Sequence, residues 1–164
     1  LKDNDPQGYE AETASILPHF NRIEQTSEGL MLVGEMGLLA RSTDNGKTWL
    51  RLEEIYPGSF FAFNSDNSQE VVAGLRGNVF SKQRDEDEWL HLESTKAATV
   101  NSIINYNNKQ WLMLANSGVI FHLQDGLLTH EQLADGKAIL GGVIKNNKLV
   151  MATEDGIKVK ELTP

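Results

Sequence analysis

Four stretches of the chain share one arrangement of apolar and polar positions: a short apolar run, a turn that contains glycine, and a second apolar run. The runs are rich in Val, Leu, Ile, Phe and Met, and two such runs joined by a tight turn predict a β-hairpin. Glycine suits the turn because it adopts the positive φ that a Cβ opposes. The stretches are LMLVGEMGLLARS (30–42), EVVAGLRGNVFSK (70–82), WLMLANSGVIFHL (111–123) and LVMATEDGIKVKEL (149–162).

The hairpins recur at a nearly constant interval. The last glycines of the four turns, Gly37, Gly77, Gly118 and Gly156, are separated by 40, 41 and 38 residues. A further apolar segment that ends in turn-forming residues precedes each hairpin, and a fourth apolar segment follows each of the first three. The pattern therefore predicts repeats of four strands over about 40 residues, which is the size and strand number of a β-propeller blade.

The repeat predicts an all-β fold made of β-propeller blades of four antiparallel strands. A β-sandwich also contains many short strands, but the regular intervals favour the propeller. We expect an N-terminal extension or the end of a preceding blade at 1–16, blades at 17–56, 57–96 and 97–136, and an incomplete blade at 137–164. Because the last repeat has three strands and four blades are the lower limit for a closed ring, we expect the C-terminal half of a larger propeller of about seven blades.

Charge and composition remove several classes of function. The net charge is -8, from 15 Lys and Arg against 23 Asp and Glu, which disfavours binding to nucleic acid or to an anionic membrane surface. No apolar run approaches the roughly 18 residues that span a bilayer. The chain has no cysteine, so disulfides, thiolate metal sites and cysteine nucleophiles are excluded.

The turn after the first hairpin matches the pattern S-x-D-x-G-x-T-W through Ser42, Asp44, Gly46, Thr48 and Trp49. Asp44 can accept hydrogen bonds from backbone N–H groups of the loop, and Gly46 can take a left-handed conformation. We expect Trp49 to bury its indole between neighbouring blades, as large aromatic side chains commonly do.

Weaker copies of this turn follow in the next two repeats. SKQRDEDEW (81–89) keeps the Ser and the Trp, with one extra residue and no Gly, and the third copy keeps only Asp125 and Gly126. A turn that tolerates imperfect copies is expected to be structural, whereas a catalytic site would not be expected in decayed multiples. We therefore interpret the motif as the corner of a blade.

The segment VGEMGLLARSTDNGKTW (33–49) resembles the blade unit of the photosystem II stability/assembly factor-like propellers of bacteria, which contain BNR or Asp-box repeats. YPGSFF (56–61) strengthens this likeness, and the resemblance covers all four repeats. It implies an exported or periplasmic propeller that acts as an assembly or scaffold module for protein partners, without catalysis. Because sialidases share the Asp-box, it implies as an alternative a BNR-repeat glycosyl hydrolase or a carbohydrate-binding propeller.

The candidate chemistry is sparse. A sialidase needs several arginines for a substrate carboxylate; we expect Arg41 and Arg51 on the surface beside the Asp-box turn, and only Arg22 and Arg76 where a central face could use them. The acidic run 85–88 lacks the alternating ligand spacing of a calcium loop, and no H-E-x-x-H pattern occurs. The sequence thus predicts no catalytic residues, metal or cofactor.

One face of the predicted propeller is the candidate partner-binding surface. The turns between the second and third strands and the connections between blades share this face, opposite to the Asp-box turns, and mixed charge with aromatic residues suits protein recognition. The candidate residues are Glu35, Arg76, Ser117, Asp155, His19, Tyr56 and Phe60. They could equally be ordinary turn residues with a core strand at 60–61. We also expect open blade edges to promote self-association.

Overall fold

The computed structural model describes residues 17–107 and 110–162, and the expected extension at 1–16 lies outside this part. The described chain forms four antiparallel sheets. The first contains β1 (Phe20–Thr26), β2 (Gly29–Gly34), β3 (Leu39–Ser42) and β4 (Leu50–Arg51). The second contains β5 (Phe60–Ser65), β6 (Gln69–Gly74), β7 (Val79–Gln83) and β8 (Leu90–Leu92). The third contains β9 (Val100–Asn107), β10 (Gln110–Ala115), β11 (Val119–Gln124) and β12 (Leu127–Gln132), and the fourth contains β13 (Ile139–Lys145), β14 (Lys148–Thr153) and β15 (Gly156–Glu161).

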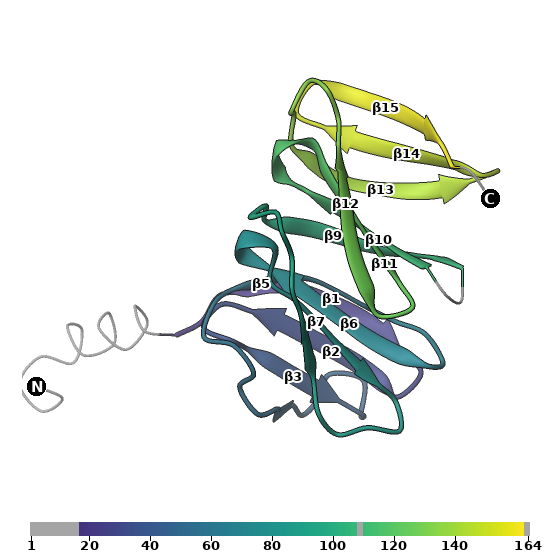
Figure 1. The fold of residues 1–164 in the computed structure, drawn as a ribbon. Coiled ribbons are helices and arrows are strands. Elements are labelled where there is room, and N and C mark those ends of the chain that lie inside the picture. The colour runs from purple at the N-terminus through teal and green to yellow at the C-terminus, as the bar shows by residue number, and fades with distance from the viewer. Residues whose placement is uncertain (1–16, 108–109, 163–164) are drawn as a thin grey trace, which may run out of the picture.

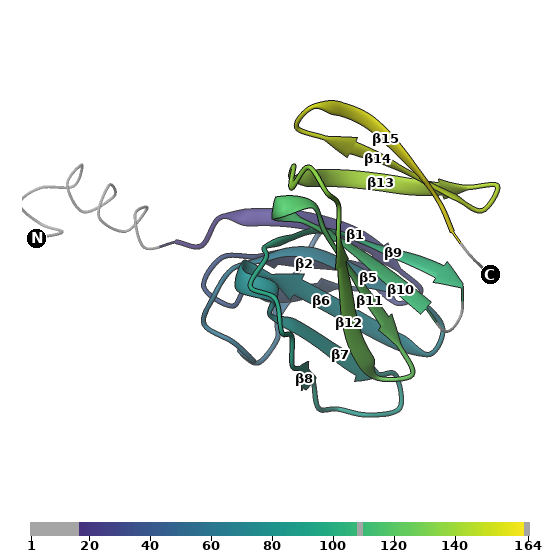
Figure 2. The ribbon, with the colours of Figure 1, turned by 45° about the horizontal axis from the view of Figure 1, so that its top comes forward.

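Within each sheet the strands pair in the order in which they occur along the chain. The sheets follow one another, and the first strands of consecutive sheets contact each other, β1 with β5, β5 with β9 and β9 with β13 (Figures 1 and 2). The predicted fold class is confirmed: the chain is all-β and consists of propeller blades of antiparallel strands, the last of them with three strands in the described residues.

The hydrophobic core lies between the sheets. Because each blade packs on both of its faces, apolar residues occupy successive positions of the central strands instead of alternating with polar ones. In β10 all residues from Trp111 to Ala115 are buried. Trp111 and Met113 pack toward the second sheet, whereas Leu112 and Leu114 pack toward the fourth. Each Å² of apolar surface that is removed from water stabilises the fold by about 25 cal/mol, so these interfaces contribute strongly to stability.

Asparagine side chains connect the first strands of neighbouring sheets. Asn21 Nδ2 donates to the Phe60 carbonyl at 2.8 Å, and Asn101 Nδ2 donates to the Ile139 carbonyl at 2.9 Å. Arg22 Nη2 reaches further and donates to the Asn101 carbonyl of the third sheet at 3.1 Å. The first strand of each sheet is an edge strand. Side-chain hydrogen bonds therefore connect it to the first strand of the next sheet and help to set the spacing of consecutive blades.

The turns between second and third strands are tightly built. Met36, Arg76 and Ser117 occupy equivalent positions with φ of 53°, 56° and 58°, and a left-handed glycine follows each of them. A Cβ on Gly77 would lie 2.4 Å from the Lys96 carbonyl oxygen, so only glycine fits against the connection between blades. The turns therefore lie side by side with these connections.

Candidate functional site

The turns between second and third strands and the connections between sheets form one surface, called here the turn face. His19 Nδ1 lies 2.8 Å from Glu35 Oε2, and Lys137 Nζ lies 3.6 Å from Asp155 Oδ2. These pairs bring residues of a connection next to residues of a turn, so the structure places His19, Glu35 and Asp155 on this surface. Glu35 and Asp155 therefore each have a partner within this surface.

Arg76 and Ser117 project from equivalent turns of the same face. Both side chains are exposed, and Arg76 makes no hydrogen bond or ion pair within residues 17–107 and 110–162. The Ser117 carbonyl accepts a hydrogen bond from Gln132 Nε2 at 2.7 Å. Arg76 is therefore a cation of this face that is available to an outside partner.

Two aromatic candidates of the turn face have structural roles. Phe60 is fully buried and packs edge-on against Phe80 with ring centroids 5.9 Å apart, so its assignment to an exposed binding face is wrong. The reason is its place in β5, where it fills the core between the first two sheets. Tyr56 is partly buried, and its hydroxyl accepts a hydrogen bond from Asn78 Nδ2 at 3.1 Å.

The turn at residues 42–49 is closed by its own side chains. Asp44 Oδ1 accepts from the Thr48 backbone N–H at 2.9 Å and from Ser42 Oγ at 2.9 Å, and Asp44 Oδ2 accepts from Thr48 Oγ1 at 2.7 Å. The hydrogen bonds from the hydroxyl and the backbone N–H of Thr48, with that from Ser42, lower the pKa of Asp44 to about 2. Gly46 has a φ of 84°. The carboxylate acts here as the acceptor that holds the turn.

The structure corrects two expectations beside this turn. The Trp49 side chain is not buried between blades: the residue is 37% exposed, and its Nε1 donates to the Gly46 carbonyl of the same turn at 3.1 Å. Arg41, expected on the surface, is mostly buried because it points toward the second sheet and pairs with the buried Glu70. Neither role was visible in the sequence, since both depend on which sheet face each side chain takes.

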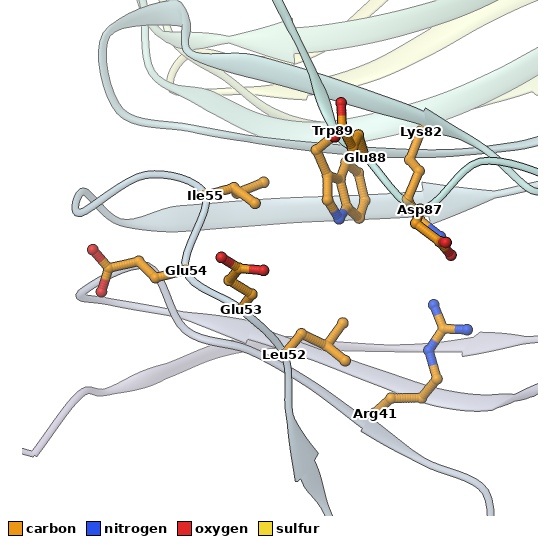
Figure 3. A pocket seen from close by; sticks show the side chains of 9 residues that line it. All are labelled: Arg41, Leu52, Glu53, Glu54, Ile55, Lys82, Asp87, Glu88 and Trp89. Atoms are coloured by element: carbon orange, nitrogen blue, oxygen red, sulfur yellow. The ribbon is translucent and has the colours of Figure 1, made fainter.

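A cleft of about 570 Å³ opens between the outer parts of the first and second sheets and is called here the rim cleft. Arg41 and the segment 52–55 line it from the first sheet, and Lys82 with the segment 87–89 lines it from the second, as Figure 3 shows. Leu52, Ile55 and Trp89 pack against the core between the two sheets. The cleft thus has an apolar base that ends at a partly exposed indole.

Four carboxylates belong to residues that line the cleft; that of Glu53 points toward the indole and that of Glu54 points away from it (Figure 3). The four residues are Glu53, Glu54, Asp87 and Glu88, which are exposed and make no hydrogen bond or ion pair within the part of the chain that the structure describes. They are free to interact with a ligand of opposite charge.

The two cations of the rim cleft are already paired. Arg41 Nη2 donates to Glu70 Oε1 at 2.6 Å, and Lys82 Nζ lies 3.6 Å from Glu70 Oε2. Glu70 is only 2% exposed, so these two cations take the place of the water that solvates an exposed carboxylate. Arg41 also pairs with Glu28, which in turn accepts from Arg84 at 2.8 Å. The network sets three cations against the two carboxylates of Glu70 and Glu28, and the acidic side chains of the cleft lie outside it.

Sequence reasoning did not identify the rim cleft. Its residues come from two groups of positions that lie 27 to 48 residues apart in the sequence, and the acidic run 85–88 was considered above only as a calcium loop. The run is exposed, and no group of three or more His, Asp or Glu side chains in the described residues could hold a metal ion. The one feature of the sequence that pointed to this cleft was Trp89. It follows Trp49 by 40 residues, but its turn lacks the glycine of the first turn.

The chain matches no protein-family model, and no curated protein matches it by sequence. Solved structures match it well. The computationally designed protein Ika4 aligns with a TM-score of 0.70 and 15% identity, over 88% of this chain and 92% of Ika4. YCF48 bound to a D1 peptide aligns with a TM-score of 0.62 and 15% identity, over 87% of this chain and 50% of YCF48. PorZ, a surface component of the type-IX secretion system of Porphyromonas gingivalis, aligns with a TM-score of 0.62 and 18% identity, over 89% of this chain and 20% of PorZ.

These similarities concern the fold. A WD40 β-propeller domain is also among the matching structures, and the identities are too low to carry function. The chain spans half of YCF48 and a fifth of PorZ, although it covers nearly all of Ika4. No helix in residues 17–107 and 110–162 has the length and apolar content to cross a bilayer. The four sheets are blades of a β-propeller, similar to propellers that include a peptide-bound assembly-type protein and a bacterial surface protein.

Proposed function

We propose that this chain is a non-catalytic protein-interaction module whose rim cleft binds an extended, basic and apolar segment of a partner protein. The observation that carries the proposal is the cleft itself, with an apolar base beside Trp89 and four unpaired carboxylates among the lining residues. A cationic side chain of a partner would contact these carboxylates, and its apolar neighbours would cover the base. YCF48, which shares the fold, binds a peptide, and this supports a propeller that takes peptides.

The acidic side chains of the cleft favour a partner segment with positive charge. Arg41 and Lys82 both pair with Glu70, and the four outer carboxylates outnumber these two cations, so the cleft is acidic. Lys82 Nζ lies 5.9 Å from the centre of the Trp89 ring, which shows that the indole can face a cation. The net charge of -8 adds a general attraction for basic segments that salt weakens.

The test uses a fluorescent peptide of sequence LRVRLR, with LEVELE as the acidic counterpart, and measures fluorescence anisotropy at two salt concentrations. We expect the basic peptide to bind and the acidic one not to. The double variant Glu53→Gln/Asp87→Asn should weaken binding about tenfold, because it removes two of the four unpaired carboxylates among the lining residues.

The matched control removes two exposed carboxylates outside the cleft, Glu93→Gln/Asp125→Asn, and changes the net charge by the same amount. Binding should be nearly unchanged in this control. Equal weakening in both double variants would mean that the net charge alone explains the attraction, and it would contradict the rim cleft as the site. Absence of binding by LRVRLR would contradict the proposal as well.

The turn face is a second candidate surface because Arg76 is unpaired there. Arg76→Gln distinguishes the two surfaces: it should leave binding in the rim cleft intact and should weaken a partner that docks on the turn face. Carbohydrate binding, the alternative suggested by the Asp-box resemblance, stays a prediction that a glycan-binding assay on the same variants would test. We further propose an exported setting for the module, in line with the surface location of PorZ.

A further inference from the structure

Each interface between consecutive sheets is built from the same positions. The forward face of a sheet contributes a cross-strand pair from its second and third strands, namely Val33 with Leu39, Ala73 with Val79, and Leu114 with Ile120. All six side chains are fully buried, and they belong to the clusters that join the first to the second, the second to the third, and the third to the fourth sheet.

The backward face of the following sheet contributes residues of its first strand. Phe60 and Phe63 do this in β5, and Val100 and Ile103 do so in β9. Phe60 and Val100 each lie next to a register shift in the pairing with the second strand. Three positions further on, Phe63 lies opposite Val72 and Ile103 lies opposite Met113. The interface is thus a repeated contact between unlike faces, one forward and one backward.

Two faces of this kind have no partner sheet in the described residues: the backward face of the first sheet and the forward face of the fourth. In the first sheet, Phe20 and Ile23 hold the positions of Phe60 and Phe63 by strand register, yet they are 70% and 55% exposed. In the fourth sheet, Ile157 pairs with Ala152 as Ile120 pairs with Leu114, and Ile157 is 71% exposed. Exposed aromatic and β-branched side chains at interface positions indicate a surface that another sheet covers.

The forward face of the fourth sheet has room for a large side chain. A hollow of about 400 Å³ lies on the forward face of the fourth sheet, lined by Gly141, Gly142, Val143, Val150, Met151, Ala152 and Ile157. A Cβ on Gly141 would meet no atom within 4 Å, so the absence of a side chain there leaves room that a large residue would fill. Phe20 is the large residue that the backward face of the first sheet presents.

We propose that a second copy of this chain covers the forward face of the fourth sheet with the backward face of its own first sheet, while its fourth sheet covers the first sheet of the first copy. Two copies then form one ring of eight sheets with closed head-to-tail contacts. The contact continues the three interfaces that already exist within the chain. Because each copy carries a net charge of -8, added salt strengthens the association.

Sedimentation of the chain over a range of concentrations tests this. The expected species has twice the mass of a single chain. Phe20→Glu on the backward face and Ile157→Lys on the forward face should each weaken association at least about tenfold, because either change places a charge in an apolar contact. Both positions are exposed in the single chain, so circular dichroism should show folded variants.

Mixing the two variants separates the head-to-tail contact from general adhesion. The mixed pair keeps one unaltered interface and places opposite charges at the other, so association should return. Leu127→Lys is the matched control, because Leu127 is equally exposed but lies outside both faces, and it should associate like the unchanged chain. A chain that stays monomeric at its highest soluble concentration, or variants that do not restore association on mixing, would overturn the proposal.

Discussion

The turn at residues 42–49 and the turn at residues 81–89 occupy the same place in consecutive sheets, but they use their polar side chains differently. In the first turn Asp44 accepts three hydrogen bonds from its own loop, and the Trp49 indole donates to the backbone of the same loop. In the second turn Asp87 and Glu88 make no contact of this kind, and Trp89 faces the rim cleft. One copy of the motif stabilises itself, and the other offers its side chains to solvent and to a ligand.

This difference teaches that a repeated motif can be structural in one blade and available for binding in the next. The second copy lacks the glycine and has one more residue, so the hydrogen-bond pattern of the first copy cannot form. The residues released from that pattern are acidic. Their position beside the cleft is what makes them candidates for recognition.

The largest effect on stability is expected at Glu70, which lies between the two turns in the sequence. Arg41 precedes the first turn, Lys82 lies at the start of the second, and both pair with Glu70. Glu70→Ala should lower the free energy of unfolding by about 3 kcal/mol, because it removes the carboxylate partner of the mostly buried Lys82 and leaves Arg41 with Glu28 alone. Urea denaturation followed by tryptophan fluorescence measures this. A loss no larger than that of an ordinary surface substitution would show that the network contributes little.

A smaller effect is expected at the first turn. Asp44→Asn should destabilise the chain above pH 4, because the amide accepts hydrogen bonds less strongly than the carboxylate. The pKa of Asp44 is about 2 in the folded chain against an ordinary 3.8, so its contribution is fully present above the ordinary value and is lost as the pH falls through about 2. Thermal unfolding from pH 5 to pH 2 should therefore show that the difference between the variant and the unchanged chain shrinks with acid. A constant difference would contradict the assigned role.

The smallest effect on stability is expected at the second turn. Asp87→Asn and Glu88→Gln should each change the free energy of unfolding by less than about 0.5 kcal/mol, since both side chains are exposed and unpaired. The same urea experiment measures it. A clear loss of stability would mean that this turn is structural like the first one, and it would remove the ground for assigning its carboxylates to binding.

The arrangement of strands could be predicted from the sequence to a large extent, and the candidate site only in part. The period of 40, 41 and 38 residues counts the blades, because each blade repeats the same hairpin and turn chemistry. The connectivity of a blade led us to expect His19 and Glu35 on the same face, and their contact was seen only in the structure. The rim cleft did not follow, because it arises where the short outer strands β4 and β8 leave space between two sheets.

The sequence by itself determined the blade repeat, the hairpin turns with their glycines and the acidic character of the surface, since these depend on local backbone preference and composition. The tertiary structure alone decided which equivalent residues are buried. Phe20 and Phe60 hold the same position in two repeats, yet Phe20 is exposed and Phe60 is buried. Burial depends on whether another sheet packs against the residue, and packing between sheets is a property of the assembled molecule. For the same reason only the structure showed Arg41 paired with Glu70 between two blades.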